Sequence, residues 1–201
     1  MPDVYSESEN ALESGIMAFS RPSRNKEPLD ENALYEYALQ SLGRRMRTVA
    51  ELRRLMRNRV EAGEAGEAKM QAVIARLKEY RYLDDSAYAA DYARLRQENA
   101  RLGKRRVRQD LQVKGVNAEI ITQTLDAAYE NVDEEALARR HLERKGIRQP
   151  TNDKESARVM RMLVRAGFST GIIYKVLRHW NASEDALAAL GEDEAEEPGE
   201  F

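Results

Sequence analysis

The sequence predicts an all-α protein whose helices form three tandem three-helix repeats in an elongated, curved array. Ala, Leu, Glu, Arg and Lys dominate the 201 residues, of which 34% are charged and 6% are aromatic. This composition favours helices over sheets. Apolar residues recur at helical spacing between short breaks, and one part of that pattern returns 52 residues further along the chain.

The best-defined part of the repeat is a helix, a tight turn and a second helix. The matched pairs are Val107 with Val159, Leu111 with Leu163, Gly115 with Gly167, and Leu125 with Leu177. The glycine is expected to end the first helix in the left-handed conformation. Asn117 in one copy and Ser169 in the other then begin the next helix as N-caps. An apolar residue before each cap is placed to form a hydrophobic staple.

A looser copy precedes these two and predicts a third unit. Its apolar residues are Leu52, Leu55, Val60, Val73, Ile74 and Leu77. Eight extra residues fall in the segment EAGEAGEA at 61–68, which is either a linker or a helix extension. Amphipathic stretches at 34–42, 88–95 and 136–142 precede the three helix pairs. The predicted organisation is a flexible N-terminal arm at 1–30, repeats at 31–83, 84–131 and 132–180, and an acidic disordered tail at 181–201.

Charge is distributed unevenly along the chain, although the net charge is only −2. Residues 30–180 contain 30 basic and 22 acidic residues, whereas residues 181–201 contain eight acidic residues and no basic one. A basic body with an acidic tail can attract nucleic acid or an acidic protein surface. The tail is either a solubilising extension or a competitor for the basic face of the body.

Several functional classes are disfavoured by the sequence. The chain has no cysteine, which excludes thiol catalysis, cysteine zinc sites and disulfides. It has no apolar run long enough to span a bilayer and no signal-peptide core, so a cytoplasmic location is expected. His141 and His179 have no matching carboxylate constellation, and Asp84 and Asp85 are expected to cap a helix. We predict a monomer that is not an enzyme and that has no cofactor and no metal site.

Basic side chains recur on the equivalent helix of each predicted unit. The candidate binding residues are Arg53, Arg54 and Arg57 in the first unit, Arg101, Lys104, Arg105, Arg108 and Lys114 in the second, and Lys154, Arg158, Arg161 and Arg165 in the third. Spacings of three and four residues place such side chains on one helix face. With regular stacking, the stripes would join into one positive surface for phosphates or acidic side chains. The alternative is that each stripe is only the solvated face of an amphipathic helix.

Two segments resemble the motifs of a known family. Tyr82-Leu83-Asp84-Asp85, followed by Tyr88-Ala89, resembles the signature that joins the first and second repeats of RecX proteins. The run from Arg101 to Val107, continued by Leu111 and Lys114-Gly115-Val116, resembles the second-repeat motif of the same family. The resemblance covers about residues 31–180. It implies three three-helix units and a non-enzymatic regulator that binds RecA and the RecA–DNA filament. Such a regulator limits recombinase and co-protease activity in DNA repair and the SOS response.

The chain departs from the family pattern in three places. These are the EAGEAGEA insertion, Arg59 at a position where glycine is expected, and an extra segment at Ile147–Asn152. A second interpretation stays open, because three-helix units with a tight turn also resemble helix-turn-helix domains. The chain would then bind single- or double-stranded DNA independently of RecA. No base-reading pattern is evident, so DNA binding is expected to be largely sequence-independent and sensitive to salt. A strong preference for one duplex over its competitors would instead indicate a sequence-specific repressor.

Overall fold

The computed structural model describes residues 27–180, so most of the predicted N-terminal arm and the whole acidic tail lie outside the described residues. Residues 27–180 form nine α-helices, one short π-helical segment and no strand. The prediction of an all-α fold is confirmed. Within this range, no helix is both long and apolar enough to cross a membrane.

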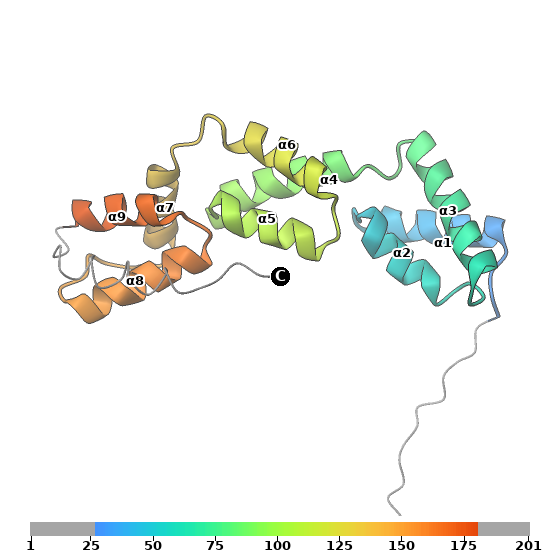
Figure 1. The fold of residues 1–201 in the computed structure, drawn as a ribbon, viewed down its shortest axis with the longest axis horizontal. Coiled ribbons are helices and arrows are strands. Elements are labelled where there is room, and N and C mark those ends of the chain that lie inside the picture. The colour runs from blue at the N-terminus through green and yellow to red at the C-terminus, as the bar shows by residue number, and fades with distance from the viewer. Residues whose placement is uncertain (1–26, 181–201) are drawn as a thin grey trace, which may run out of the picture.

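The helices pack in three groups of three, which follow one another along an elongated molecule (Figure 1). The first group contains α1 (Glu31–Arg44), α2 (Val49–Arg57) and α3 (Glu64–Glu79). The second contains α4 (Asp85–Leu95), α5 (Lys104–Val113) and α6 (Ala118–Tyr129), with the π-helical segment η1 (Arg96–Ala100) between α4 and α5. The third contains α7 (Glu134–Arg144), α8 (Asp153–Arg165) and α9 (Thr170–His179). The unit boundaries given above stay a prediction.

The repeated turn forms as the sequence indicates. Gly115 follows α5 with φ of +76° and Gly167 follows α8 with φ of +88°, a conformation that costs glycine little. The Asn117 side chain accepts a hydrogen bond of 2.8 Å from the backbone N–H of Glu119 and so caps α6. Ser169 occupies the same place before α9, but its side chain makes no capping bond. The two copies therefore share a backbone path and differ in one stabilising contact.

The insertion in the first group is mainly a helix extension. Gly63 has φ of +98° and stands at the N-cap of α3, which then begins at Glu64. Gly66 lies in the first turn of this helix, and a Cβ atom there would collide with the carbonyl oxygen of Glu61. At the start of the group, Leu29 N–H donates to the Arg59 carbonyl and Asp30 caps α1. Leu29 and Asp30, the last two residues of the predicted arm, are therefore hydrogen-bonded to the first group.

The buried side chains form two separate cores. One core lies within the first group and contains Leu34, Leu52, Met56 and Leu77, among others. The other runs through the second and third groups without a break, from Leu111 and Leu125 to Leu163, Phe168 and Leu177. The second and third groups therefore form one apolar body, to which the first group is joined by other means.

Candidate partner-binding cleft

The second and third groups meet where the start of α5 touches the end of α8. Gly103 N–H donates to the Ala166 carbonyl at 2.8 Å, and Arg105 N–H donates to the Gly167 carbonyl at 3.2 Å. A Cβ atom on Gly103 would collide with the backbone of Gly167, and one on Gly167 would collide with Arg106. Two glycines thus allow the two backbones to approach closely enough for direct hydrogen bonds.

A cleft of about 520 Å³ opens beside this contact. Its lining comes from both groups and consists of Arg96, Leu102, Arg106, Asp110, His141, Lys145, Arg158, Met162, Arg165 and Ala166. Five of these residues are basic side chains and one is a carboxylate. The apolar side chains among them belong to the margin of the shared core. The cleft is therefore strongly positive, with an apolar part to its lining.

Within residues 27–180, most of the positive charge in this cleft has no carboxylate partner. The carboxylate of Asp110 accepts from Arg106 Nε at 3.0 Å and from the Tyr92 hydroxyl at 3.0 Å, so it forms an ion pair with only one of the five basic side chains. The other basic side chains of the lining make no ion pair within the described part of the chain; they are Arg96, Lys145, Arg158 and Arg165. Cations that face one hollow without counter-charges favour a bound anion.

His141 is a structural residue of the cleft wall. The residue is 4% exposed, its Nδ1 lies 3.0 Å from the Ala100 carbonyl oxygen, and its ring meets the Phe168 ring edge-on. Burial lowers the pKa of His141 below its ordinary value of 6.5, and the nearby charges of Lys145 and Arg144 lower it further. The ring is consequently neutral near pH 7, with a hydrogen on Nδ1 that it donates to the carbonyl. Between residues 27 and 180, no group of three or more potential metal ligands comes together.

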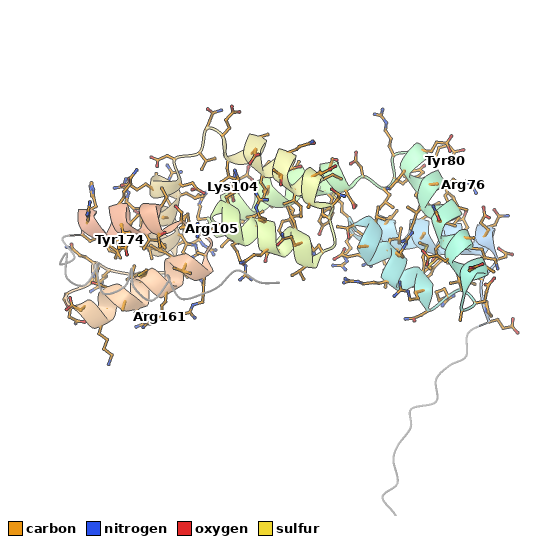
Figure 2. The ribbon with its side chains drawn as sticks, viewed as in Figure 1. Arg76, Tyr80, Lys104, Arg105, Arg161 and Tyr174 are labelled. Carbon is orange, nitrogen blue, oxygen red and sulfur yellow. The ribbon has the colours of Figure 1, made fainter. Side chains whose placement is uncertain are left out.

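The predicted stripe on α5 points away from this cleft. Lys104 Nζ pairs with Asp126 of α6 at 2.7 Å, and Arg108 donates to the Thr122 hydroxyl at 3.1 Å. Arg101 is half-buried and donates to the Gln97 carbonyl, whereas Arg105 is exposed. Figure 2 shows Lys104 and Arg105 at the end of α5 nearest the third group, and Arg161 on α8 beyond it. Much of this stripe is engaged with α6 and with its own backbone.

Lys114 lies at the joint between the first and second groups. Its Nζ pairs with Glu51 Oε1 at 3.1 Å and lies over the rings of Tyr88 and Tyr92, at 5.7 and 5.5 Å from their centroids. Its backbone carbonyl accepts from the Thr48 hydroxyl at 2.7 Å. Hydrogen bonding to Tyr88 and Glu51 raises the pKa of Lys114, which therefore stays charged. These contacts give the side chain a role in joining α2 to α4 and α5.

Asp85 strengthens the same joint. The sequence suggests that Asp84 and Asp85 both act as helix caps, and Asp84 does accept from the N–H groups of Ser86 and Ala87 at the start of α4. Asp85 instead accepts at 2.9 Å from the backbone N–H of Val49, at the start of α2 in the first group. Burial raises the pKa of Asp85 despite this hydrogen bond. The pair of carboxylates thus caps one helix in each of two groups.

The remaining predicted residues lie on two other helices. On α2, Arg53 pairs with Glu67 at 3.3 Å, while Arg54 and Arg57 are exposed. On α8, the exposed basic residues are Lys154, Arg158, Arg161 and Arg165. Of the twelve candidates, the cleft includes Arg158 and Arg165. A single surface that joins all three stripes stays a prediction.

Sequence reasoning missed three of the basic residues in the cleft. Arg96, Arg106 and Lys145 come from η1, α5 and the end of α7. No spacing rule connects residues on three different elements, because their convergence depends on how two helix groups dock. Arg106 gave the only hint, since it extends the basic run of Lys104 and Arg105.

Comparison with protein-family models gives two matches in this part of the chain. The model described as "RecX, second three-helix domain" matches residues 84–125, and the model described as "RecX, third three-helix domain" matches residues 133–177. Together the two matches contain every helix that lines the cleft.

Individual proteins match over a longer stretch. The protein from Myxococcus xanthus named "Regulatory protein RecX" is 34% identical over 170 residues, which are 78% of this chain and 88% of that relative. The one of the same name from Leptothrix cholodnii is 36% identical over 143 residues, 70% of this chain and 85% of the relative. The crystal structure of RecX from Lactobacillus salivarius has the same fold, with a TM-score of 0.60 at 20% identity over 75% of this chain and 96% of that one.

Proposed function

Because the chain belongs to the RecX family of regulatory proteins, which are not enzymes, we propose that it binds the RecA recombinase and the RecA–DNA filament and inhibits recombinase and co-protease activity. The observation that carries the proposal is the cleft between the second and third groups. Four of its basic side chains form no ion pair with any residue between 27 and 180, and they line a hollow of about 520 Å³. Acidic side chains or backbone phosphates are the groups that such a cleft attracts.

The shape of the molecule supports a mechanism in which inhibition is steric. The three helix groups follow one another in an elongated array (Figure 1). Laid along a filament, such an array contacts adjacent RecA protomers and obstructs the groove that a homologous duplex or a repressor substrate must enter. The exposed basic residues on α8 add sequence-independent, salt-sensitive attraction to DNA or to acidic loops.

The test is RecA-dependent ATP hydrolysis and strand exchange on single-stranded DNA with increasing amounts of this protein. Inhibition is expected at or below equimolar protein. The double variant Arg158→Glu with Arg165→Glu should require about tenfold more protein, which corresponds to roughly 1.4 kcal/mol of binding free energy. The matched control is Arg44→Glu with Arg45→Glu, which makes the same charge change at exposed positions at the end of α1.

Three outcomes would contradict the proposal. One is the absence of any effect on RecA at equimolar protein under both low and moderate salt. Another is equal weakening by both double variants, which would assign the effect to net charge and not to the cleft. The third is tight binding to one DNA duplex over its competitors in the absence of RecA, which would favour the helix-turn-helix alternative.

A further inference from the structure

The end of the described chain is held beside a second hollow. The carbonyl of Trp180, which follows α9, accepts a hydrogen bond of 2.6 Å from Gln149 Nε2. Gln149 belongs to the extra segment Ile147–Asn152, which departs from the family pattern and otherwise has no role in the proposed function. This segment therefore holds Trp180, the last residue that the structure describes.

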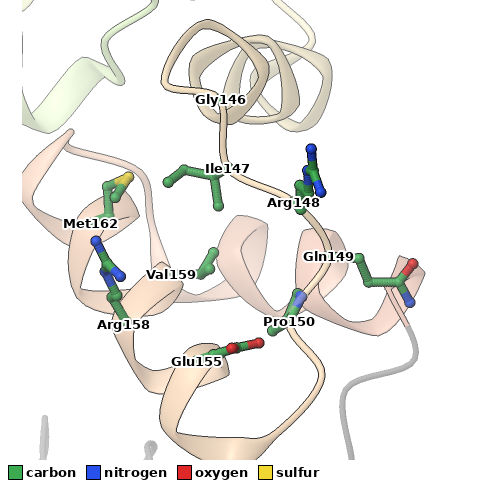
Figure 3. A pocket seen from close by; sticks show the side chains of 9 residues that line it. All are labelled: Gly146, Ile147, Arg148, Gln149, Pro150, Glu155, Arg158, Val159 and Met162. Atoms are coloured by element: carbon green, nitrogen blue, oxygen red, sulfur yellow. The ribbon is translucent and has the colours of Figure 1, made fainter.

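The same segment builds one wall of the second hollow, which has a volume of about 200 Å³ (Figure 3). One side of the hollow is lined by Ile147, Gln149 and Pro150 of the extra segment. The other side is lined by Arg158, Val159 and Met162 of α8. Arg158 and Met162 also line the cleft between the second and third groups. The two hollows therefore adjoin along α8, and Gln149, which holds the Trp180 carbonyl, lines the smaller of them.

The chain beyond Trp180 has the composition that suits this path. Residues 186–190 are Ala-Leu-Ala-Ala-Leu, and the hollow beside the extra segment presents Ile147, Val159 and Met162. The next segment, Glu192–Glu197, contains five carboxylates and no basic residue. Two further carboxylates, Glu184 and Asp185, precede the apolar segment, and the hollow beside the extra segment is also lined by Arg148, Arg158 and Glu155. From residue 186 onward, the tail is first apolar and then acidic, and along α8 the hollow with apolar side chains is followed by the positive cleft.

The tail is also long enough to reach the cleft. From Glu155 to Arg165, α8 rises by about 15 Å, at roughly 1.5 Å per residue. Eleven residues lie between Trp180 and Glu192, and the twelve steps from one to the other span up to about 40 Å when extended, at roughly 3.3 Å per residue. A tethered segment also has an effective concentration on the order of millimolar, far above that of a free acidic peptide.

We propose that residues 181–197 bind to their own body along α8, with the apolar segment against Ile147 and Val159 and the acidic segment in the cleft formed by Arg96, Arg106, Lys145, Arg158 and Arg165. The acidic tail is then an internal occupant of the cleft. Its regulatory consequence, a competition between tail and partner, rests on the proposed function, whereas the intramolecular contact itself does not.

The experiment needs neither RecA nor DNA. Because the natural chain has no cysteine, Ala195→Cys creates a single attachment site for a nitroxide spin label. In uniformly ¹⁵N-labelled protein, we expect loss of signal at the backbone amides of Arg106, Lys145 and Arg165 and no loss in α1–α3. The loss should disappear at about 1 M salt, where the Debye length is roughly 3 Å.

Matched variants identify the cause of the contact. Arg158→Glu with Arg165→Glu should abolish the loss of signal, and Arg44→Glu with Arg45→Glu should retain it. Both pairs are exposed, and α6 carries neither, so an unchanged amide spectrum of α6 and of the helices away from the substituted residues reports that each variant is folded. Replacing the carboxylates of residues 192–197 by their amides should have the same effect as the cleft variant.

The following outcomes would overturn the proposal. No loss of signal at the cleft means that the tail does not bind there. A loss that persists at high salt or with the neutral tail means that charge is not the cause. In an equal mixture of unlabelled nitroxide-bearing protein and ¹⁵N-labelled protein without nitroxide, loss of signal means that the tail binds a second copy of the chain instead of its own body.

Discussion

Two glycines determine how closely the second and third helix groups approach. Gly103 has φ of −73°, a value open to any residue, so it is required for space and not for backbone freedom. Gly167 is required for both reasons, since it has φ of +88° and also lies against Arg106. The repeat pattern predicted the glycine at 167 as a helix stop. The pattern of a single repeat cannot predict the contact of Gly167 with α5, because this contact forms between two helix groups.

Gly103→Ala should therefore destabilise the body formed by the second and third groups. The added methyl group collides with backbone atoms of Gly167 and Phe168, which cannot rotate away as a side chain can. We expect a loss of about 1–3 kcal/mol in the free energy of unfolding, measured by urea denaturation. Gly43→Ala in α1 is the control, because a Cβ atom there meets nothing within 4 Å. Equal effects of the two changes would show that close approach is not what Gly103 provides.

His141 should make stability depend on pH. Its folded-state pKa is lowered by burial, whereas the unfolded chain titrates near the ordinary value of 6.5. Above 6.5 both states are neutral and the stability is complete. As the pH falls below that value, the unfolded state binds a proton that the folded state resists, and stability is lost down to the folded-state pKa.

His141→Asn separates this contribution from those of other titrating groups. The amide can still donate to the Ala100 carbonyl but does not titrate. The free energy of unfolding, measured by urea denaturation at several values between about pH 5 and 8, should fall less steeply toward acid in the variant than in the natural protein. The same slope in both proteins would assign the acid sensitivity to other residues.

At the scale of single elements, the sequence was most informative about helix starts and stops. Asn117, Gly115 and Gly167 act as the repeat predicted, because caps and left-handed turns are local features with their own residue preferences. η1 was not predicted. It ends at Arg101, a non-glycine residue with φ of +53°, so the usual residue signal for a left-handed helix end is missing. Local hydrogen bonds from the Arg101 and Leu102 N–H groups to the Gln97 and Arg96 carbonyls hold that turn, together with the contact of His141 with the Ala100 carbonyl.

The two equivalent caps provide a matched comparison. Asn117→Ala removes a side-chain oxygen that accepts from the Glu119 N–H, and it should cost about 1 kcal/mol of unfolding free energy. Ser169→Ala, at the equivalent place before α9, removes no capping bond and should cost a few tenths of a kcal/mol at most. Thermal or urea unfolding of the two variants measures the difference. A larger cost at Ser169 would contradict the cap assignment.

At the scale of the whole molecule, the first group is a separate module joined by polar contacts. Its core lies within residues 34–83, and the contacts across the joint include those of Thr48, Asp85 and Lys114. The other two groups share one core. The sequence predicted three similar repeats, and it could not indicate that only one of the two junctions is apolar. The two junctions differ because different helix faces meet in them. The apolar pattern of a repeat indicates only which helix faces pack into the core of that repeat.

Thr48→Val should selectively loosen the first group. The change keeps the shape of the side chain but leaves the Lys114 carbonyl and the Glu51 N–H without the Thr48 hydroxyl. We expect the opening free energy of amides in α3, such as Val73 and Leu77, to fall by about 1–3 kcal/mol, as measured by native-state hydrogen exchange. Amides of Leu125 and Leu163 should be unaffected.

The control for this change is Thr122→Val on α6. Its hydroxyl accepts from Arg108 at an exposed position within the second group, so its loss does not touch the joint. If Thr48→Val lowered protection equally in all three groups, the molecule would open as one unit and the first group would not be a separate module.

The separate core of the first group also has a consequence for synthesis on the ribosome. Every residue of that core precedes α4, so the group can fold before α4 leaves the exit tunnel. The second group differs, because its apolar side chains belong to a core that is closed by Phe168 and Leu177, far downstream. The nascent chain therefore contains a folded first group followed by a second group whose core is incomplete. This state lasts for the time needed to translate about fifty residues, at roughly 5–20 residues per second.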